Sequence, residues 1–139
     1  MRTAVDTNIF SALWSGEPTA SAVVALLGEA RAKGGIVICG AVYAELLAHP
    51  KATQAFVDGF LMQTGVTAEF DTDEKIWRDA ARAYARYAQR RRVSGGTQTK
   101  RLLVDFIVGA HAVNRADRLL TLDVSRYAQD FPKLTLASL

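Results

Sequence analysis

Three carboxylates in this 139-residue chain occupy comparable places, each beside a short apolar run. Asp6 directly follows the first apolar run, at 3–5, and Asp123 directly follows a later one. Glu45 lies just over one turn into a helix that is expected to follow 36–39, a run typical of a strand buried on both faces. In open parallel sheets, ligands bind beyond the carboxyl ends of the strands. The three acids are therefore expected to project toward one rim of a sheet.

A fourth acid, Asp105, interrupts an apolar stretch that is expected to be helical. A lone carboxylate in such surroundings is costly, so Asp105 is expected to face a cation. Clustered acids need a counter-charge as well, because like charges ~4 Å apart repel by about 4 kcal/mol at an effective dielectric of 20. Oxygen ligands without His or Cys favour Mg²⁺ or Mn²⁺ over zinc. The four acids together predict a site for such an ion.

Each acid also has a simpler interpretation. Asp6 and Asp123 could each serve only as the N-cap of a helix. Glu45 could point to solvent, and Asp105 could be a structural residue. The joint pattern is harder to explain in this way than any one of its members.

The surrounding pattern predicts an α/β fold with a central, mainly parallel sheet of four to five strands flanked by helices. One domain over 1–139 fits the length. Strands are expected at 3–5, 36–39, 66–70, 118–122 and 134–136. Helices are expected at about 20–33, 41–49, 52–63, 71–92 and 99–114. In the helix at 20–33, one face is expected to hold Ala20, Val23, Val24, Leu27 and Ala30.

The motifs resemble, in order, the four motifs of PIN-domain ribonucleases, and the length is typical of VapC-type toxins from VapBC toxin–antitoxin pairs. The matching segments are the strand before Asp6-Thr7-Asn8, the helical 41–46, the helical 104–112 and the late 120–123. The resemblance implies a PIN-like three-layer fold. The catalytic acids that it implies are Asp6, Glu45, Asp105 and Asp123, with metal held by Asp6, Asp105 and Asp123. Leu122 departs from the family pattern, in which a basic or polar residue is common at this place.

The resemblance further implies that Asn8 and Thr121 support the carboxylates by hydrogen bonding. The activity that it implies is Mg²⁺-dependent hydrolysis of phosphodiester bonds in RNA, with Mn²⁺ as a substitute ion. The implied partners are a small VapB-like antitoxin and a second copy of the chain. Two alternatives stay open: an RNA-processing nuclease outside a toxin–antitoxin pair, and a catalytically silent binding module, whose signature would be the loss of one acid.

A row of arginines is spaced every four residues at Arg78, Arg82, Arg86 and Arg90. We call this row the arginine stripe; it could be a solvated helix face or a phosphate track. The candidate RNA-binding residues are Arg82, Arg86, Arg90, Lys100 and Arg101. The net charge is only +3, but if four carboxylates hold metal, ten remain against seventeen Lys and Arg, an excess of seven. Such a surface attracts polyanions.

Other features narrow the class of protein. The longest apolar stretches are broken by Glu45 and Asp105, and no signal peptide is visible, so a soluble cytoplasmic protein is expected. His49 and His111 are expected to play no part in metal binding. The helices at 20–33, 42–47 and 52–62 carry more apolar residues than one core needs, which suggests a surface for a protein partner.

Overall fold

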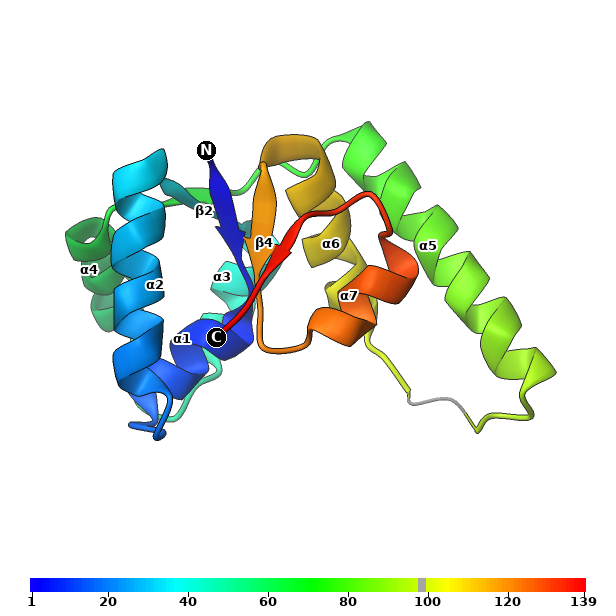
Figure 1. Cartoon of the computed structure of the whole chain (residues 1–139), viewed down its shortest axis with the longest axis horizontal. Helices are drawn as coiled ribbons and strands as arrows, with labels where there is room; N and C mark the ends of the chain where they lie inside the picture. Colours follow the sequence, from blue (N-terminus) through cyan, green and yellow to red (C-terminus); the bar gives the residue numbers. More distant parts are fainter. Residues whose placement is uncertain (98–99) are drawn as a thin grey trace.

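The computed structural model describes residues 1–97 and 100–139, which form a five-stranded parallel sheet between helices (Figure 1). The strand order is β3-β2-β1-β4-β5, and every neighbouring pair is parallel. The strands are β1 (Thr3–Val5), β2 (Ile36–Cys39), β3 (Val66–Glu69), β4 (Arg118–Leu120) and β5 (Leu136–Ala137). The predicted α/β class and parallel sheet are confirmed.

The order in which strands are added to the sheet reverses beside β1, and we call this place the switch point. The chain passes from β1 to β2 and β3 on one side and then crosses to β4 and β5 on the other. Ala4 pairs with Val37 of β2 and with Leu119 of β4, and Val5 pairs with Leu120. The carboxyl ends of β1 and β4 are therefore adjacent, at the kind of crevice where parallel sheets bind ligands.

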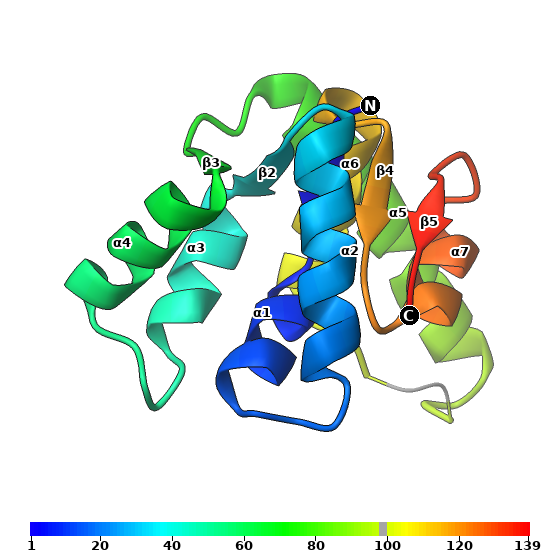
Figure 2. The same cartoon turned by 60° about the vertical axis from the view of Figure 1, so that its left-hand side comes forward.

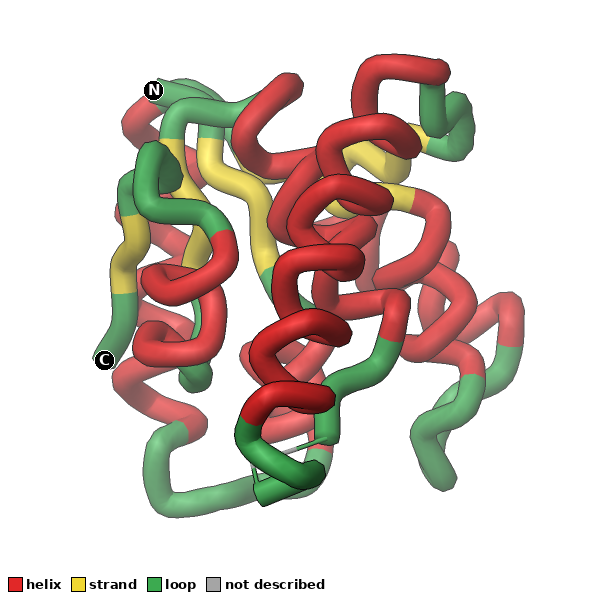
Figure 3. Tube along the Cα trace, turned by 90° about the vertical axis from the view of Figure 1, so that its right-hand side faces the viewer, coloured by secondary structure: helices red, strands yellow, loops and turns green. Residues whose placement is uncertain are grey.

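Helices cover both faces of the sheet. Figure 2 shows α2 in front of the strands and α5 and α6 behind them, and Figure 3 shows helices covering the strands from the side of α5. The helices are α1 (Thr7–Trp14), α2 (Ala20–Lys33), α3 (Gly40–Leu47), α4 (Gln54–Thr64), α5 (Glu74–Val93), α6 (Leu103–Arg115) and α7 (Val124–Asp130). The arrangement has the predicted three layers. Within the described residues, none of these helices combines the length and the apolar character that a membrane span requires.

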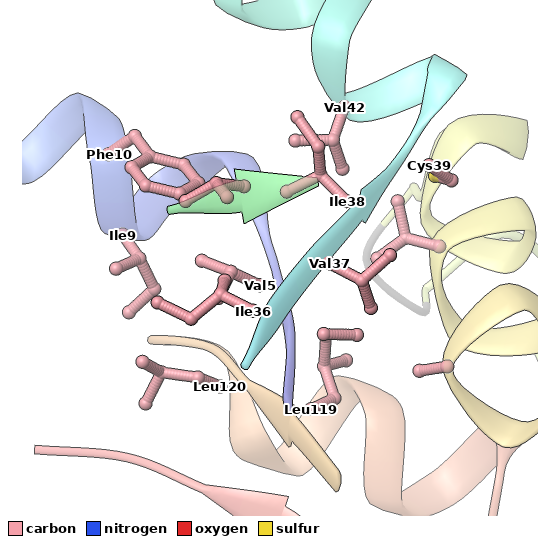
Figure 4. Packing of buried hydrophobic residues seen from close by; sticks show 14 of the residues in the cluster. Val5, Ile9, Phe10, Ile36, Val37, Ile38, Cys39, Val42, Leu119 and Leu120 are labelled. Carbon is pink, nitrogen blue, oxygen red and sulfur yellow. The ribbon is translucent and has the colours of Figure 1, made fainter. Parts of the chain in front are cut away.

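The core lies between the sheet and its helices. All four residues of β2 are buried, as predicted for a strand covered on both faces (Figure 4). Close packing continues on the α6 side, where Gly109 faces the ring of Phe131, and a Cβ at this position would overlap that ring. Because Gly109 has no side chain, α6 can pack directly against the segment that follows α7.

The start of α6 differs from the prediction. The helix begins at Leu103, whereas a start near position 99 was expected; that position lies outside the described residues. The backbone N–H of Arg101 donates instead to the hydroxyl of Tyr87, at 2.7 Å, and this bond anchors the chain before the helix. The strand β4 also ends earlier than expected, at Leu120. The short helix α7 follows Asp123, where a helix was considered only as an alternative explanation of that acid.

The predicted apolar face of α2 is correct for Val23, Leu27 and Ala30, which are buried. It is wrong for Val24, which is 56% exposed. Positions 23, 27 and 30 form a narrow stripe along one side of a helix, and Val24 lies about 100° away from Val23. This residue lines a hollow between α2 and α4 instead of the core.

Candidate active site

Asp6 occupies the switch point, directly after β1. Its residue is 7% exposed, and its carboxylate accepts three hydrogen bonds. The Thr7 backbone N–H donates to Oδ1 at 2.8 Å, which also makes Asp6 the N-cap of α1. The Thr121 hydroxyl donates to Oδ2 at 2.8 Å, and the Tyr127 hydroxyl donates to the same oxygen at 3.1 Å. These bonds fix the carboxylate at the end of the central strand.

The hydrogen bonds do not fully compensate the burial of Asp6. Loss of water around the carboxylate raises its pKa from 3.8 to about 6, against the lowering effect of the Thr121, Tyr127 and Thr7 bonds. The negative charge of Asp105 raises it further. Asp6 and Asp105 are thus close enough to repel each other. Burial together with the charge of Asp6 raises the pKa of Tyr127, so its hydroxyl stays a donor.

Short polar side chains connect the other acids to this centre. The Thr7 hydroxyl donates to Glu45 Oε1 at 2.6 Å, and α3 carries Glu45 toward the start of α1. The Asn8 amide donates to Asp123 Oδ2 at 3.2 Å. Thr121 Oγ1 also accepts from the Asp123 backbone N–H, at 3.0 Å. Asn8 and Thr121 therefore contact the carboxylates that they were expected to support.

Asp105 lies in the first turn of α6, and its side chain is 21% exposed. A cation was expected beside it, and two guanidinium groups are there. Arg101 Nε lies 3.7 Å from its Oδ2, and Arg126 Nη1 lies 4.0 Å from the same atom. The counter-charge of this carboxylate in the structure is therefore arginine.

Arg101 does not lie on an exposed surface, so its predicted place among the RNA-binding residues is wrong. Its residue is 7% exposed, and its guanidinium pairs with Asp130, whose residue is 1% exposed. It also donates to the Arg126 carbonyl at 3.1 Å and lies over the ring of Phe106, 4.6 Å from the centroid. Burial of this arginine is possible because the fold supplies a buried acid as its partner.

All four predicted acids belong to one connected network. It runs from Glu45 through Thr7 to Asp6, from Asp6 through Thr121 to Asp123, and from Asp123 through Arg126 to Asp105. Among the described residues, however, no three His, Cys, Asp or Glu side chains are gathered as they would be around a metal ion. The donor set, carboxylate oxygens only, fits a hard divalent cation. The repulsion between Asp6 and Asp105 fits such an ion as well.

Three residues of the network were missed by the sequence analysis: Tyr127, Arg126 and Asp130. All lie on α7, which was not among the expected helices. A usable signal was present, since Asp123 precedes a short segment in which Tyr127 and Asp130 are spaced by three residues. Asp123 itself stands before α7, but its side chain makes no capping hydrogen bond there.

The arginine stripe is mostly occupied with acids of the protein. Arg78 pairs with Glu74 at 2.8 Å, and Arg82 pairs with Asp79. Arg90 is partly buried and pairs with Asp130. Arg86 donates to the Asp130 carbonyl at 3.4 Å, and Lys100 is exposed.

Arg82 and Arg86 line a hollow of about 380 Å³. Its other charged residues are Lys75, Asp79, Asp130 and Lys133. Of the predicted RNA-binding residues, Arg82, Arg86 and Lys100 stay accessible candidates. Both histidines have partners outside the acidic network: His111 Nε2 contacts Glu69 Oε1 at 2.8 Å, and His49 Nε2 contacts Ser15 Oγ at 3.1 Å.

Comparison with known families matches residues 3–130 to the PIN domain. The match covers nearly the whole chain, and the chain belongs to the PIN domain family. A comparison with curated protein sequences finds no match.

Solved structures share the fold at low sequence identity. The chain is similar to VapBC2 from Rickettsia felis, whose structure was solved with a DNA fragment from the promoter of VapBC2. The TM-score is 0.67, the identity is 22%, and the match covers 99% of this chain and 98% of that one. It is similar to VapBC-1 from nontypeable Haemophilus influenzae, with a TM-score of 0.62, 20% identity, and coverage of 99% and 98%. It is also similar to Mycobacterium tuberculosis VapC20, a sarcin–ricin loop cleaving toxin. The TM-score is 0.55, the identity is 15%, and the match covers 89% of this chain and 93% of that one.

The raised pKa of Asp6 predicts how the Asp6→Asn variant responds to pH in the absence of metal. The folded protein binds the Asp6 proton more tightly than the unfolded chain, so the charged form destabilises it above pH 6. Asn carries no charge, so the variant should be more stable than the parent at pH 8, by at most about 3 kcal/mol. The advantage should fall as the pH falls through 6 and disappear near pH 4. Urea unfolding in EDTA at several pH values measures it.

The control for this experiment is Asp79→Asn. Hydrogen bonds from Asn114 and Lys75 lower the pKa of Asp79 to about 2, so this variant should be less stable than the parent at neutral pH. A constant stability difference between Asp6→Asn and the parent from pH 8 to pH 4 would contradict the buried-carboxylate interpretation.

Proposed function

We propose that this protein is a metal-dependent endoribonuclease and the toxin of a VapBC-type pair. The observation that carries the proposal is the connected network of four carboxylates at the switch point of a PIN fold. Asp6 is at its centre, buried and incompletely compensated. Such a carboxylate is stabilised by a divalent cation, and a metal-dependent nuclease uses such an ion at the phosphate that it cleaves.

The residues of the network have two roles: some hold the carboxylates, and the carboxylates would hold the ion. Thr121 and Tyr127 hold the Asp6 carboxylate, and Thr7 and Asn8 hold Glu45 and Asp123. The ion would be held by Asp6, Asp105 and Asp123, with Glu45 beside them. A bound Mg²⁺ or Mn²⁺ supplies the charge that neutralises the transition state and lowers the pKa of water. The carboxylates of Asp6 and Asp123 would fix the position of that ion, because hydrogen bonds hold both of them in place.

The first test is Asp105→Asn. RNA cleavage in Mg²⁺ should fall by roughly two orders of magnitude or more, because the variant loses a metal-binding charge. EDTA should abolish cleavage by the parent. The matched control is Asp117→Asn, since Asp117 precedes β4 and its carboxylate accepts from the Arg2 backbone N–H. Circular dichroism should show both variants folded. Full cleavage by Asp105→Asn, or RNA binding by the parent without any cleavage, would contradict the nuclease assignment.

The protein has an apolar surface that an antitoxin could bind. Two adjoining hollows, of about 290 and 260 Å³, lie along α2 and α4 and share Phe60 and Gln63. We call them together the α2–α4 groove. Val24 and Phe56 line it and are 56% and 41% exposed. An apolar groove between helices suits the apolar face of a partner helix. The similar structures from Rickettsia felis and Haemophilus influenzae are VapBC complexes, which supports this occupant.

The groove is tested with Val24→Glu. The exposed position tolerates the change, but a partner that buries it must desolvate the new carboxylate. Co-expression with the small protein encoded by the neighbouring reading frame should therefore yield no stable complex, and the variant should inhibit growth despite that neighbour. Ala25→Glu is the control, because Ala25 is exposed on the same helix and does not line the groove. Equal capture of both variants would exclude the α2–α4 groove. Light scattering of the protein alone tests the homodimer, which stays a prediction.

The RNA-binding proposal rests on Arg82 and Arg86 in their hollow. Replacing both with Ala should weaken RNA binding regardless of sequence, and it should lower the slope of log affinity against log salt by roughly 0.7 for each lost contact. The control is Arg31→Ala with Lys33→Ala, which removes the same charge from α2 on the other face of the sheet. Filter binding in EDTA measures both slopes. If the two double variants have equal slopes of log affinity against log salt, the arginine stripe is a solvated helix face and not a phosphate track.

A further inference from the structure

One guanidinium lies between two of the proposed metal-binding carboxylates. Arg126 Nη1 is 3.6 Å from Asp123 Oδ2 and 4.0 Å from Asp105 Oδ2. These two acids come from different elements, since Asp105 is on α6 and Asp123 precedes α7. The same nitrogen atom therefore lies near two carboxylates that are proposed to hold the metal ion.

The two arginines beside Asp105 are held in different ways. The Arg101 side chain is 6% exposed, pairs with the fully buried Asp130 and donates to the Arg126 carbonyl. Moving Arg101 from this place would break its buried ion pair with Asp130 and leave that acid with Arg90 alone, and breaking a buried pair is strongly unfavourable. Arg101 is a fixed part of the structure.

Arg126 is held loosely by comparison. Its side chain is 35% exposed, and both of its ion pairs are longer than a hydrogen bond. Ion pairs that are partly exposed and longer than a hydrogen bond contribute little to stability. The side chain can therefore leave the two carboxylates for solvent at little cost, and its backbone carbonyl would still accept from Arg101.

We propose that Arg126 is a built-in competitor of the divalent cation. In the metal-free protein its guanidinium neutralises Asp105 and Asp123, and a divalent ion must displace it to bind there. This inference rests on the proposed metal site. The consequence is a protein that binds its ion more weakly than its acids alone would.

The test measures the affinity of the full chain for Mn²⁺ by isothermal titration calorimetry without RNA. Arg126→Gln should bind Mn²⁺ about two- to tenfold more tightly than the parent, since up to two weak ion pairs no longer compete. Arg126→Lys keeps the charge and should stay closer to the parent. Arg78→Gln removes the same charge from α5, where the partner is Glu74, and should leave the affinity unchanged. Arg126→Ala repeats the measurement if the Gln variant does not fold.

The outcomes separate this inference from the proposed function. If Arg126→Gln binds Mn²⁺ no more tightly than the parent while Asp105→Asn binds it more weakly, the metal site stands and the competition is wrong. If Arg78→Gln gains as much affinity as Arg126→Gln, the effect is one of net charge and the competition is again wrong. A parent that binds no Mn²⁺, or binds it as well as Asp105→Asn does, overturns both proposals.

Discussion

Burial of the Asp6 carboxylate is the constraint to which the rest of the site responds. Asp6 follows the central strand, with β2 and β4 on either side, so the chain leaves the sheet where water has little access. Three hydrogen-bond donors converge on the carboxylate, yet its pKa stays raised, at about 6. A carboxylate in this condition gains more from a nearby cation than a solvated one does, because little water has to be displaced. The fold thus makes a positive charge at the switch point stabilising.

A second buried charge keeps the surroundings of Asp105 in place. Asp130 is fully buried and is paired with Arg90 of α5 and with Arg101, just before α6. It thereby joins three segments that are distant in sequence, and breaking such a pair typically costs about 3–5 kcal/mol. Arg101 extends this anchor to Asp105. The position of an acid in the proposed metal site therefore depends on an ion pair outside that site.

The PIN fold also separates the proposed activities in space. The carboxylate network lies at the carboxyl ends of β1 and β4, whereas the α2–α4 groove is lined by residues of α2 and α4. Solved structures 15–22% identical to this chain have the same fold. Most side chains differ at that identity, so the chemistry has to be argued from the residues of this chain.

The sequence by itself determined the strands, most of the helices and the acids at the strand ends. These follow from apolar runs and their spacing, which are local, and the parallel-sheet rule then places Asp6 near Asp123. Only the tertiary structure decided which basic residues are accessible. Arg101 resembles a surface cation in sequence, but it is buried because the fold brings Asp130 to it from 29 residues away. Tyr127 donates to Asp6 from 121 residues away, and Arg126 bridges acids of two different elements. The partner of a charge depends on contacts between distant segments, and no local pattern encodes them.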